Sequence, residues 1–343
     1  MIMQRNHGIS RFVIAISSVL LLGVSTAHAA TESGAKKVIE LKLDHVTSAE
    51  AINGQDVIFF ADQIDKLSNG RIKLRVYHQG ALTGGSGQVA LEQVIAGTLD
   101  LSYPTTGYYG NVLPALQVLS LPFYYPSYDS MDKALEGPLG QMLHDQWAAK
   151  GVKVLGWYPR TGRQLTNSRG RIVKPDDMKG LKIRVIDSPI YTSTMKMLAA
   201  NPTPMPWGEV YTALQLKVID AQENPVDAIR SEKVYEVQKF MTVWDYSSDA
   251  LFLMMNMKKW ESLSAEDKKV LQDAANLMKK RHRDAVLGAY SSGIEFVKTQ
   301  GMTVDVLTPE QKAAFQKVVT PIWAQFAPTI GQSVMEAART GMQ

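Results

Sequence analysis

The 343-residue chain contains no cysteine. A cysteine nucleophile, a thiolate metal site and a disulfide framework are therefore excluded, and the fold must be stabilised by its hydrophobic core alone. Histidine is also scarce: the six residues are scattered without metal-ligand spacing (His7, His28, His45, His78, His144 and His282). We therefore expect no metal site and no cofactor.

The chain also has no large excess of positive or negative charge. The sequence has 37 lysines and arginines against 33 aspartates and glutamates. Two of the basic residues, Arg5 and Arg11, lie in an N-terminal segment that we expect to be removed. A nucleic-acid-binding protein would carry a basic stripe. None is visible, and we expect no nucleic-acid partner.

No apolar run is long enough to span a bilayer, which requires about 20 residues. The run at residues 12–24 follows a basic start and precedes Ala27-His28-Ala29, a small-x-small cleavage pattern. We predict a secretory signal at residues 1–29. The alternative, a short membrane anchor, is disfavoured because no charged stop-transfer segment follows. Export without disulfides fits a bacterial periplasm best, with a mature protein that is not embedded in the membrane.

The remaining sequence alternates between strand and helix patterns. Residues 38–44 and 72–77 alternate apolar and polar side chains, and residues 54–67 between them have helical spacing. This order is typical of an α/β domain. The strand at 151–158 leads into a new polar stretch, which indicates a crossing between two domains. Residues 240–257 are strongly apolar and are expected to cross back.

Three further expectations concern helices and a strand. We predict one helix over 131–147, a buried strand at 218–221, and a long helix that begins after Ser264 and continues to residue 297, followed at the C-terminus by a pair of helices. The long helix carries the basic run Lys279–Arg283. A solvated helix face is the favoured interpretation of this run, with a partner-docking patch as the alternative.

The glycine-rich run at 80–87 invites comparison with catalytic loops. It is followed by no Lys-Ser/Thr pair, which a phosphate loop requires. It also lacks the final glycine of the Gly-x-Ser-x-Gly elbow of hydrolases. An enzymatic role for this run is therefore disfavoured.

The stretch from residue 178 to 226 brings together three side chains suited to holding an acid. Arg184 lies in an alternating strand, Trp207 follows a proline-rich segment, and Asn224 precedes Pro225. Arginine offers a planar fork of donors that matches a carboxylate, and an amide supplies both a donor and an acceptor. The combination favours binding of an acid over its chemical conversion.

Along nearly its whole mature length the chain resembles the DctP-type substrate-binding subunits of tripartite ATP-independent periplasmic (TRAP) transporters. The resemblance rests on several motifs taken together. They are Gly80-Ala81-Leu82, Gly97-Thr98-Leu99-Asp100, Leu121-Pro122-Phe123, the run from Arg163 to Arg169, Gly180-Leu181-Lys182-Ile183-Arg184-Val185, the segments 201–205 and 208–215, and Gln222-Glu223-Asn224-Pro225.

The resemblance implies an α/β fold of two domains that close on a small organic acid, each a mixed sheet flanked by helices, with the ligand cleft between them and a long helix spanning both. We expect domain I at 36–160 plus about 250–289 and domain II at 161–249 plus about 290–343. It also implies a monomer without enzymatic activity that delivers its ligand to a small and a large membrane permease subunit. The expected ligand is a sugar acid, such as a uronate or aldonate, or a C4-dicarboxylate.

The same resemblance suggests the residues of the site. Arg184 is expected to pair with the carboxylate and Arg163 to assist, while Asn224 and Trp207 line the pocket. On the opposite wall we expect hydroxyl and phenol groups, together with a histidine after the first strand; these are Thr105, Tyr108 and His45. Two alternatives stay open: a periplasmic sensor subunit that presents ligand to a receptor, and, with less support, a periplasmic hydrolase.

Overall fold

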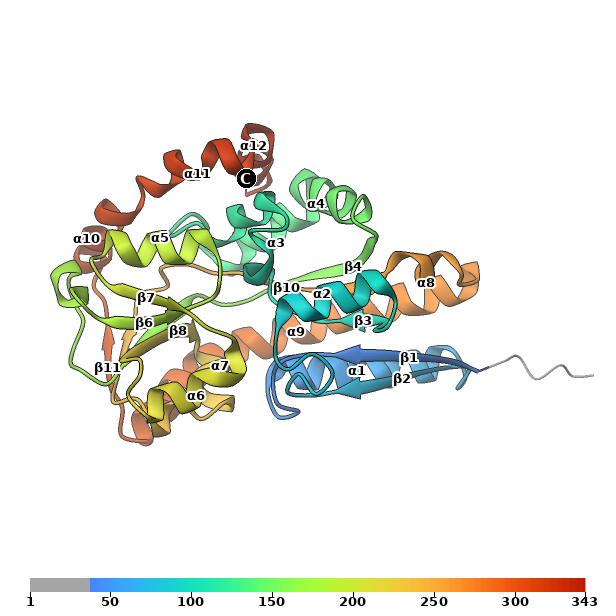
Figure 1. Cartoon of the computed structure of the whole chain (residues 1–343), viewed down its shortest axis with the longest axis horizontal. Coiled ribbons are helices and arrows are strands. Elements are labelled where there is room, and N and C mark those ends of the chain that lie inside the picture. Colours follow the sequence, from blue (N-terminus) through green and yellow to red (C-terminus); the bar gives the residue numbers. More distant parts are fainter. Residues whose placement is uncertain (1–37, 343) are drawn as a thin grey trace, which may run out of the picture. The chain divides into compact units, whose positions relative to one another are not determined.

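The structure is a computed structural model that describes residues 38–342, so the predicted signal at residues 1–29 lies outside the described part. Residues 38–342 form two β-sheets flanked by helices (Figure 1), which confirms the predicted mixed α/β class. Across these residues, no helix combines the length and the apolar character needed to cross a bilayer.

The five-stranded sheet has the order β2-β1-β3-β10-β4. Strand β1 pairs in parallel with β2 and β3, whereas β10 is antiparallel to β3 and β4. Alternation along β1 places Leu41 and Leu43 on one face, where both are fully buried. The strands are β1 (Ile39–Asp44), β2 (Ile72–Tyr77), β3 (Leu101–Ser102), β4 (Val152–Pro159) and β10 (Ala250–Asn256).

The six-stranded sheet has the order β11-β9-β5-β8-β6-β7. Its edge strand β7 contains Pro202 and Pro204, which have no N–H to donate and are therefore suited to an edge. The strand predicted at 218–221 begins only at Ala221, because Lys217 has a φ of 58° and Val218 is exposed in the preceding turn. The strands are β5 (Arg163–Asn167), β6 (Lys182–Val185), β7 (Asn201–Pro204), β8 (Ala221–Pro225), β9 (Phe240–Val243) and β11 (Thr303–Val306).

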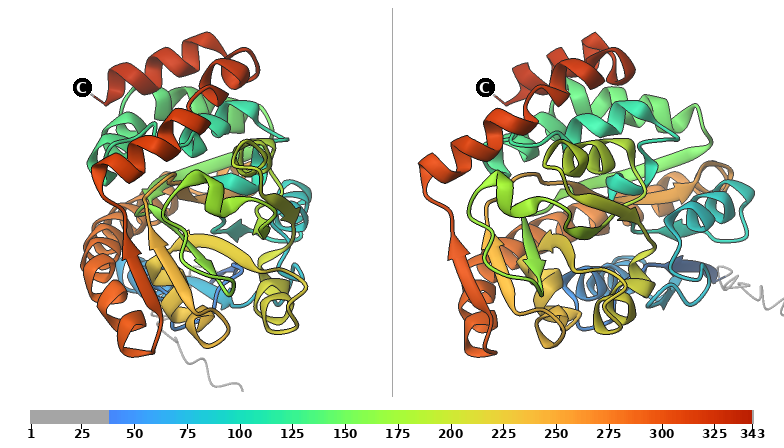
Figure 2. Two further views of the ribbon diagram at one scale, coloured as in Figure 1. Left: turned by 90° about the vertical axis from the view of Figure 1, so that its left-hand side faces the viewer. Right: turned by 60° about the vertical axis from the view of Figure 1, so that its left-hand side comes forward.

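The helices differ from expectation in two places. The single helix expected at 131–147 is two helices, since Pro138 cannot continue the first and instead begins the second. The expected C-terminal pair is three helices, which break at Pro321 and Gly331. The last two, α11 and α12, pack against η2, α3 and α4 (Figure 2). These are η2 (Pro114–Ser120), α3 (Tyr128–Glu136), α4 (Pro138–Ala148), α10 (Pro309–Val319), α11 (Ile322–Ile330) and α12 (Gln332–Gly341).

The other helical segments lie in the connections between successive strands. They are α1 (Ile52–Leu67), α2 (Gly87–Ala96), η1 (Thr106–Tyr109), η3 (Pro175–Met178), α5 (Pro189–Met197), α6 (Trp207–Gln215), α7 (Val226–Ser231), η4 (Val234–Glu236), α8 (Met257–Glu261) and α9 (Ala265–Thr299).

Two short crossing segments lead directly from a strand of one sheet to a strand of the other, while α8 and α9 form a third, longer connection from β10 to β11. The chain leaves β4 through Arg160, Thr161 and Gly162 to enter β5, and returns from β9 to β10 through residues 244–249. The two crossings lie side by side, because the Arg160 amide donates to the Asp249 carbonyl at 2.9 Å and the Arg163 amide to the Ser247 carbonyl at 2.8 Å. The predicted division into domains at 160/161 and about 249/250 stays a prediction.

Helix α9 is 35 residues long, which corresponds to about 52 Å at 1.5 Å per residue. It packs against α1 and β4 toward one end and against α7 and β11 toward the other (Figure 1). The solvated face predicted for residues 279–283 is wrong. His282 is fully buried, with Nδ1 2.6 Å from Asp56 Oδ2, and Arg281 also pairs with Asp56. Lys279 and Arg283 pair with Asp132 on α3 at 2.9 and 3.3 Å, so most of this charge is used within the fold.

Candidate functional site

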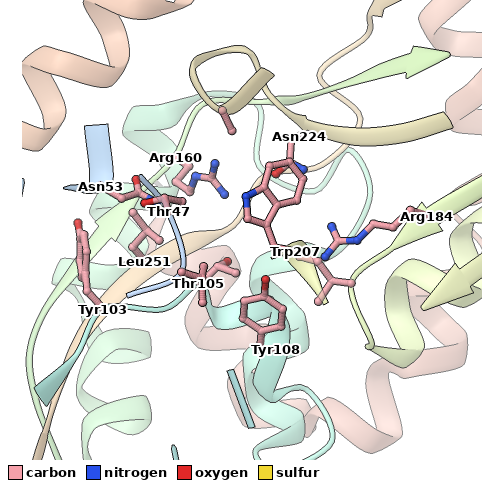
Figure 3. A pocket seen from close by; sticks show the side chains of 13 residues that line it. Thr47, Asn53, Tyr103, Thr105, Tyr108, Arg160, Arg184, Trp207, Asn224 and Leu251 are labelled. Atoms are coloured by element: carbon pink, nitrogen blue, oxygen red, sulfur yellow. The ribbon is translucent and has the colours of Figure 1, made fainter. Parts of the chain in front are cut away.

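A narrow cavity of about 30 Å³, partly open to solvent, lies between the residues of the two sheets. Figure 3 shows its polar side chains directed toward a common space. The side chains come from the five-stranded sheet and its loops (Val46, Thr47, Asn53, Tyr103, Thr105, Tyr108, Leu251), from the first crossing (Arg160), and from the six-stranded sheet and its helices (Arg184, Ile186, Trp207, Asn224, Ala228).

Arg184 occupies the cavity wall at the end of β6, where it is only 1% exposed. Its Nε and Nη2 both donate to the Met205 carbonyl, at 3.0 and 2.8 Å. No carboxylate contacts it among the described residues. Burial lowers the pKa of its guanidinium, and the Tyr108 phenol and more distant Glu223 only partly oppose this. The result is a buried positive charge without a carboxylate partner, directed toward the cavity.

Trp207 and Asn224 fix the geometry around Arg184. Met205 and Pro206 extend the chain so that Trp207 begins α6, with its ring 5.4 Å from the Arg184 guanidinium carbon. Asn224 lies in β8, where Nδ2 donates to Gln222 at 2.8 Å and Oδ1 accepts from Arg163 at 3.2 Å. These contacts orient the amide before any ligand arrives.

Thr105 and Tyr108 lie on the opposite wall, as expected from the sequence. The Thr105 hydroxyl accepts from the Gly107 amide at 3.4 Å and also bonds to the Asp249 carboxylate, while Tyr108 lines the cavity facing Arg184 (Figure 3). The structure therefore brings together five of the seven predicted site residues: Arg184, Asn224, Trp207, Thr105 and Tyr108.

Arg163 is placed differently from the expectation. It is fully buried and does not line the cavity. Its guanidinium pairs with Glu223 and donates to Asp249 at 2.7 Å, and these charges, acting against burial, raise its pKa. With these donors already engaged, Arg163 holds Asn224 and the crossing segments in place.

His45 also lies outside the cavity lining, directly beside it. It is 1% exposed, with Nδ1 3.1 Å from the hydroxyl of the lining residue Thr47 and Nε2 2.7 Å from His78 Nδ1. Burial and then the neighbouring His78 lower its pKa to about 3, so the ring is neutral at physiological pH. Its observed role is to support Thr47.

Sequence analysis missed four polar residues of the cavity, Thr47 beside His45 and three others. Arg160 is 6% exposed, and its nearest carboxylate, Asp249, is 3.6 Å away. Asn53 comes from the first turn of α1, and Tyr103 donates its hydroxyl to Asp56 at 3.4 Å. Arg160 sits three residues before Arg163 in a loop, where no periodicity reveals the direction of a side chain. Residues 38–342 contain no cluster of histidine and acidic residues that would hold a metal ion.

Two β-sheets flanked by helices are joined by two adjacent crossing segments and have a polar cavity between them. This is the architecture of a periplasmic-type solute-binding protein. The chain belongs to the bacterial extracellular solute-binding protein family 7, DctP, whose profile matches residues 43–329. This confirms the resemblance drawn from the sequence motifs.

Relatives and solved structures agree with this membership. The chain is 33% identical to the 2,3-diketo-L-gulonate-binding periplasmic protein YiaO of Escherichia coli K12, over 75% of this chain and 77% of YiaO. It is similar to the sugar acid binding protein DctPAm of Advenella mimigardefordensis, solved with galactonate, at a TM-score of 0.85 and 29% identity over 89% and 99% of the two chains. It is also similar to a TRAP solute-binding protein of Sulfurospirillum deleyianum with bound succinate, at a TM-score of 0.84 and 27% identity over 88% and 99%.

Proposed function

We propose that this protein is the periplasmic solute-binding subunit of a TRAP transporter. It captures a small organic acid by pairing the acid's carboxylate with Arg184 and delivers it to the membrane permease subunits. The observation that carries the proposal is the buried guanidinium of Arg184, which faces the polar cavity and contacts no carboxylate of its own.

The surroundings of Arg184 support binding of a carboxylate in particular. An arginine–carboxylate fork removed from water is much stronger than the same pair on a surface, where the median contribution is about 0–1 kcal/mol. Two of the guanidinium's nitrogens are held by the Met205 carbonyl, which fixes the plane of the fork. Trp207 covers it and Asn224 offers a pre-oriented amide nearby. A ligand carboxylate therefore meets a rigid site and loses little of its binding energy to ordering.

Calorimetry with a panel of sugar acids and dicarboxylates tests the proposal. We expect Arg184→Ala to weaken binding of the best acid by about 2–5 kcal/mol, because the acid's charge would be left buried without its partner. Arg75→Ala is the matched control: Arg75 lies on the exposed side of β2, pairs with Glu40 at the surface, and its loss should not change affinity. Unchanged affinity in Arg184→Ala would overturn the assignment.

The sensor alternative uses the same fold and the same cavity, so it predicts the same binding. Co-purification with the small and large permease subunits favours transport, and binding to a receptor ectodomain favours sensing. Family membership supports binding over hydrolysis, and the absence of turnover in a panel of hydrolase substrates is the expected result.

A further inference from the structure

The buried charges around the cavity do not balance. Three guanidinium groups lie there, from Arg160, Arg163 and Arg184, and all are at most 6% exposed. Two carboxylates contact them: Glu223 pairs with Arg163, and Asp249 lies 2.7 Å from Arg163 and 3.6 Å from Arg160. Both carboxylates are fully buried, and no aspartate or glutamate lines the cavity itself among the described residues.

Asp249 is held in its ionised form. Burial alone would raise its pKa, but the charges of Arg160 and Arg163, with a hydrogen bond from Thr105, lower it below the usual range. Arginine keeps its proton at any physiological pH. The pairs formed by Arg160 and Arg163 with Asp249 and Glu223 are thus neutral overall, and the charge of Arg184 remains. One negative charge from the ligand completes the balance, and a second would be buried without compensation.

Arg160 adds hydrogen-bond donors to the cavity but little net charge. Its charge is offset by Asp249, yet the 3.6 Å separation is too long for a hydrogen bond, and no hydrogen bond from its guanidinium is found within residues 38–342. The Nε atom is buried without a partner. Figure 3 shows the guanidinium directed into the cavity. Its donors therefore have no acceptor on the protein, and an oxygen of the ligand can supply one.

The residues beside Arg160 are neutral and rich in hydrogen-bonding groups. Asn53 presents an amide, Thr47 a hydroxyl supported by His45, and Tyr103 a phenol held by Asp56. In Figure 3 Asn53 and Thr47 lie beside Arg160, and Tyr103 lies farther off on the same side of the cavity, away from Arg184. This end suits hydroxyl or carbonyl oxygens.

We infer that the ligand is a polyhydroxylated monocarboxylate, such as an aldonate or a uronate, with its carboxylate at Arg184 and the oxygens of its other end at Arg160 and Asn53. The inference rests on the proposed function and narrows it. It makes Arg160 a specificity-determining residue and disfavours dicarboxylates, whose second charge would lie in a region already neutralised by Asp249.

A comparison of galactonate with galactarate tests the charge balance, since the two differ only in the oxidation of the terminal carbon to a second carboxylate. We expect the wild-type protein to bind galactonate at least about 10-fold more tightly than galactarate or succinate in calorimetry, because an unpaired buried charge is costly. Tighter binding of galactarate or succinate overturns this inference while leaving the proposed function intact. If no acid of either class binds the folded protein, the proposed function fails as well.

Variants of Arg160 test the donor role. Arg160→Gln is expected to weaken galactonate binding about 10- to 100-fold, because it removes the donors at that end. Arg160→Lys keeps the charge but loses the planar fork, and we expect it to recover less than half of the loss on a logarithmic scale. Full recovery in the lysine variant, or wild-type affinity in the glutamine variant, overturns the assignment. Circular dichroism of the unliganded variants checks that they are folded, and the wild-type comparison above does not depend on them.

Discussion

The backbone amide of Ser48 donates a hydrogen bond to Glu232 Oε1 at 3.1 Å. Ser48 belongs to the loop after β1 of the five-stranded sheet, and Glu232 caps α7, which follows β8 of the six-stranded sheet. The two residues are 184 positions apart in the sequence, and this bond joins the two sheets beside the cavity. Burial raises the pKa of Glu232, while the Ser48 amide opposes the shift.

Loss of this bond should make it easier for the two sheets to separate at the cavity. We expect Glu232→Ala to release ligand roughly 3- to 30-fold faster, because a hydrogen bond to a charged group contributes about 1–2 kcal/mol at a partly buried site. Stopped-flow measurement of ligand release gives the rate. Glu295→Ala is the control, since Glu295 is exposed and pairs only with Lys298 on the same helix. Equal release rates in the two variants would show that the bond does not limit opening.

The buried His45 predicts a loss of stability in acid. Burial, and then His78, lower its pKa to about 3 in the folded state, whereas the unfolded chain has a value near 6.5. The unfolded state therefore binds more protons between pH 6.5 and 3, so stability falls as the pH falls through this range. Between pH 7.5 and 5 the expected contribution is about 2 kcal/mol.

Denaturant unfolding at pH 7.5 and 5 measures this effect. His45→Gln lacks the titrating ring, so its loss of stability between the two pH values should be about 2 kcal/mol smaller than in the wild type. The comparison holds even if the variant is less stable at both pH values. The same pH slope in both proteins would mean that His45 is protonated in the folded state.

Asp249 offers a test that separates charge from stability. Asp249→Asn removes one of the two buried carboxylates, so the site would need two negative charges from the ligand. We expect the preference for galactonate over galactarate to shrink at least about 10-fold, or to reverse. Because the ratio compares two ligands in one variant, an overall loss of stability does not affect it. An unchanged ratio would show that Asp249 does not set the charge preference.

Much of the fold was predictable because local patterns and tertiary contacts agree. Alternation located β1 and β2, and helical spacing located α1 between them. Motifs located Arg184, Trp207 and Asn224 because the strand and helix starts that carry them are set by nearby glycines and prolines. Where one proline outweighs a run of helical spacing, as at Pro138, the sequence expectation was wrong.

Contacts between distant segments were not predictable in the same way. The different roles of Arg163 and Arg160 depend on the acceptors that surround them, and those acceptors lie 60 to 89 residues away in Glu223 and Asp249. The basic run on α9 is polar in sequence and therefore resembles a solvated face. Its true environment depends on Asp56 and on the acidic side chains of α3, which only the packing of α9 brings near.

Asp56 links α9 to the cavity, because it contacts residues of both. It is fully buried, pairs with Arg281, lies 2.6 Å from His282 and accepts from Tyr103, which lines the cavity. Asp56→Asn keeps the shape but removes the charge, which leaves Arg281 without its partner. We expect a loss of about 2–4 kcal/mol of stability, in line with breaking a buried ion pair.

Thermal unfolding with and without ligand measures both consequences. For a chain of this size, a loss of about 3 kcal/mol corresponds to a decrease of roughly 4–5 °C in the midpoint. Ligand affinity should also fall, because asparagine keeps only one of the two oxygens that Arg281 and Tyr103 now contact, so the phenol of Tyr103 is held less firmly. Lys280→Ala is the matched control: Lys280 belongs to the same basic run but is exposed, so its removal should change neither quantity. Equal midpoints for Asp56→Asn and Lys280→Ala would mean that the basic run acts as the solvated face first expected, despite its observed contacts.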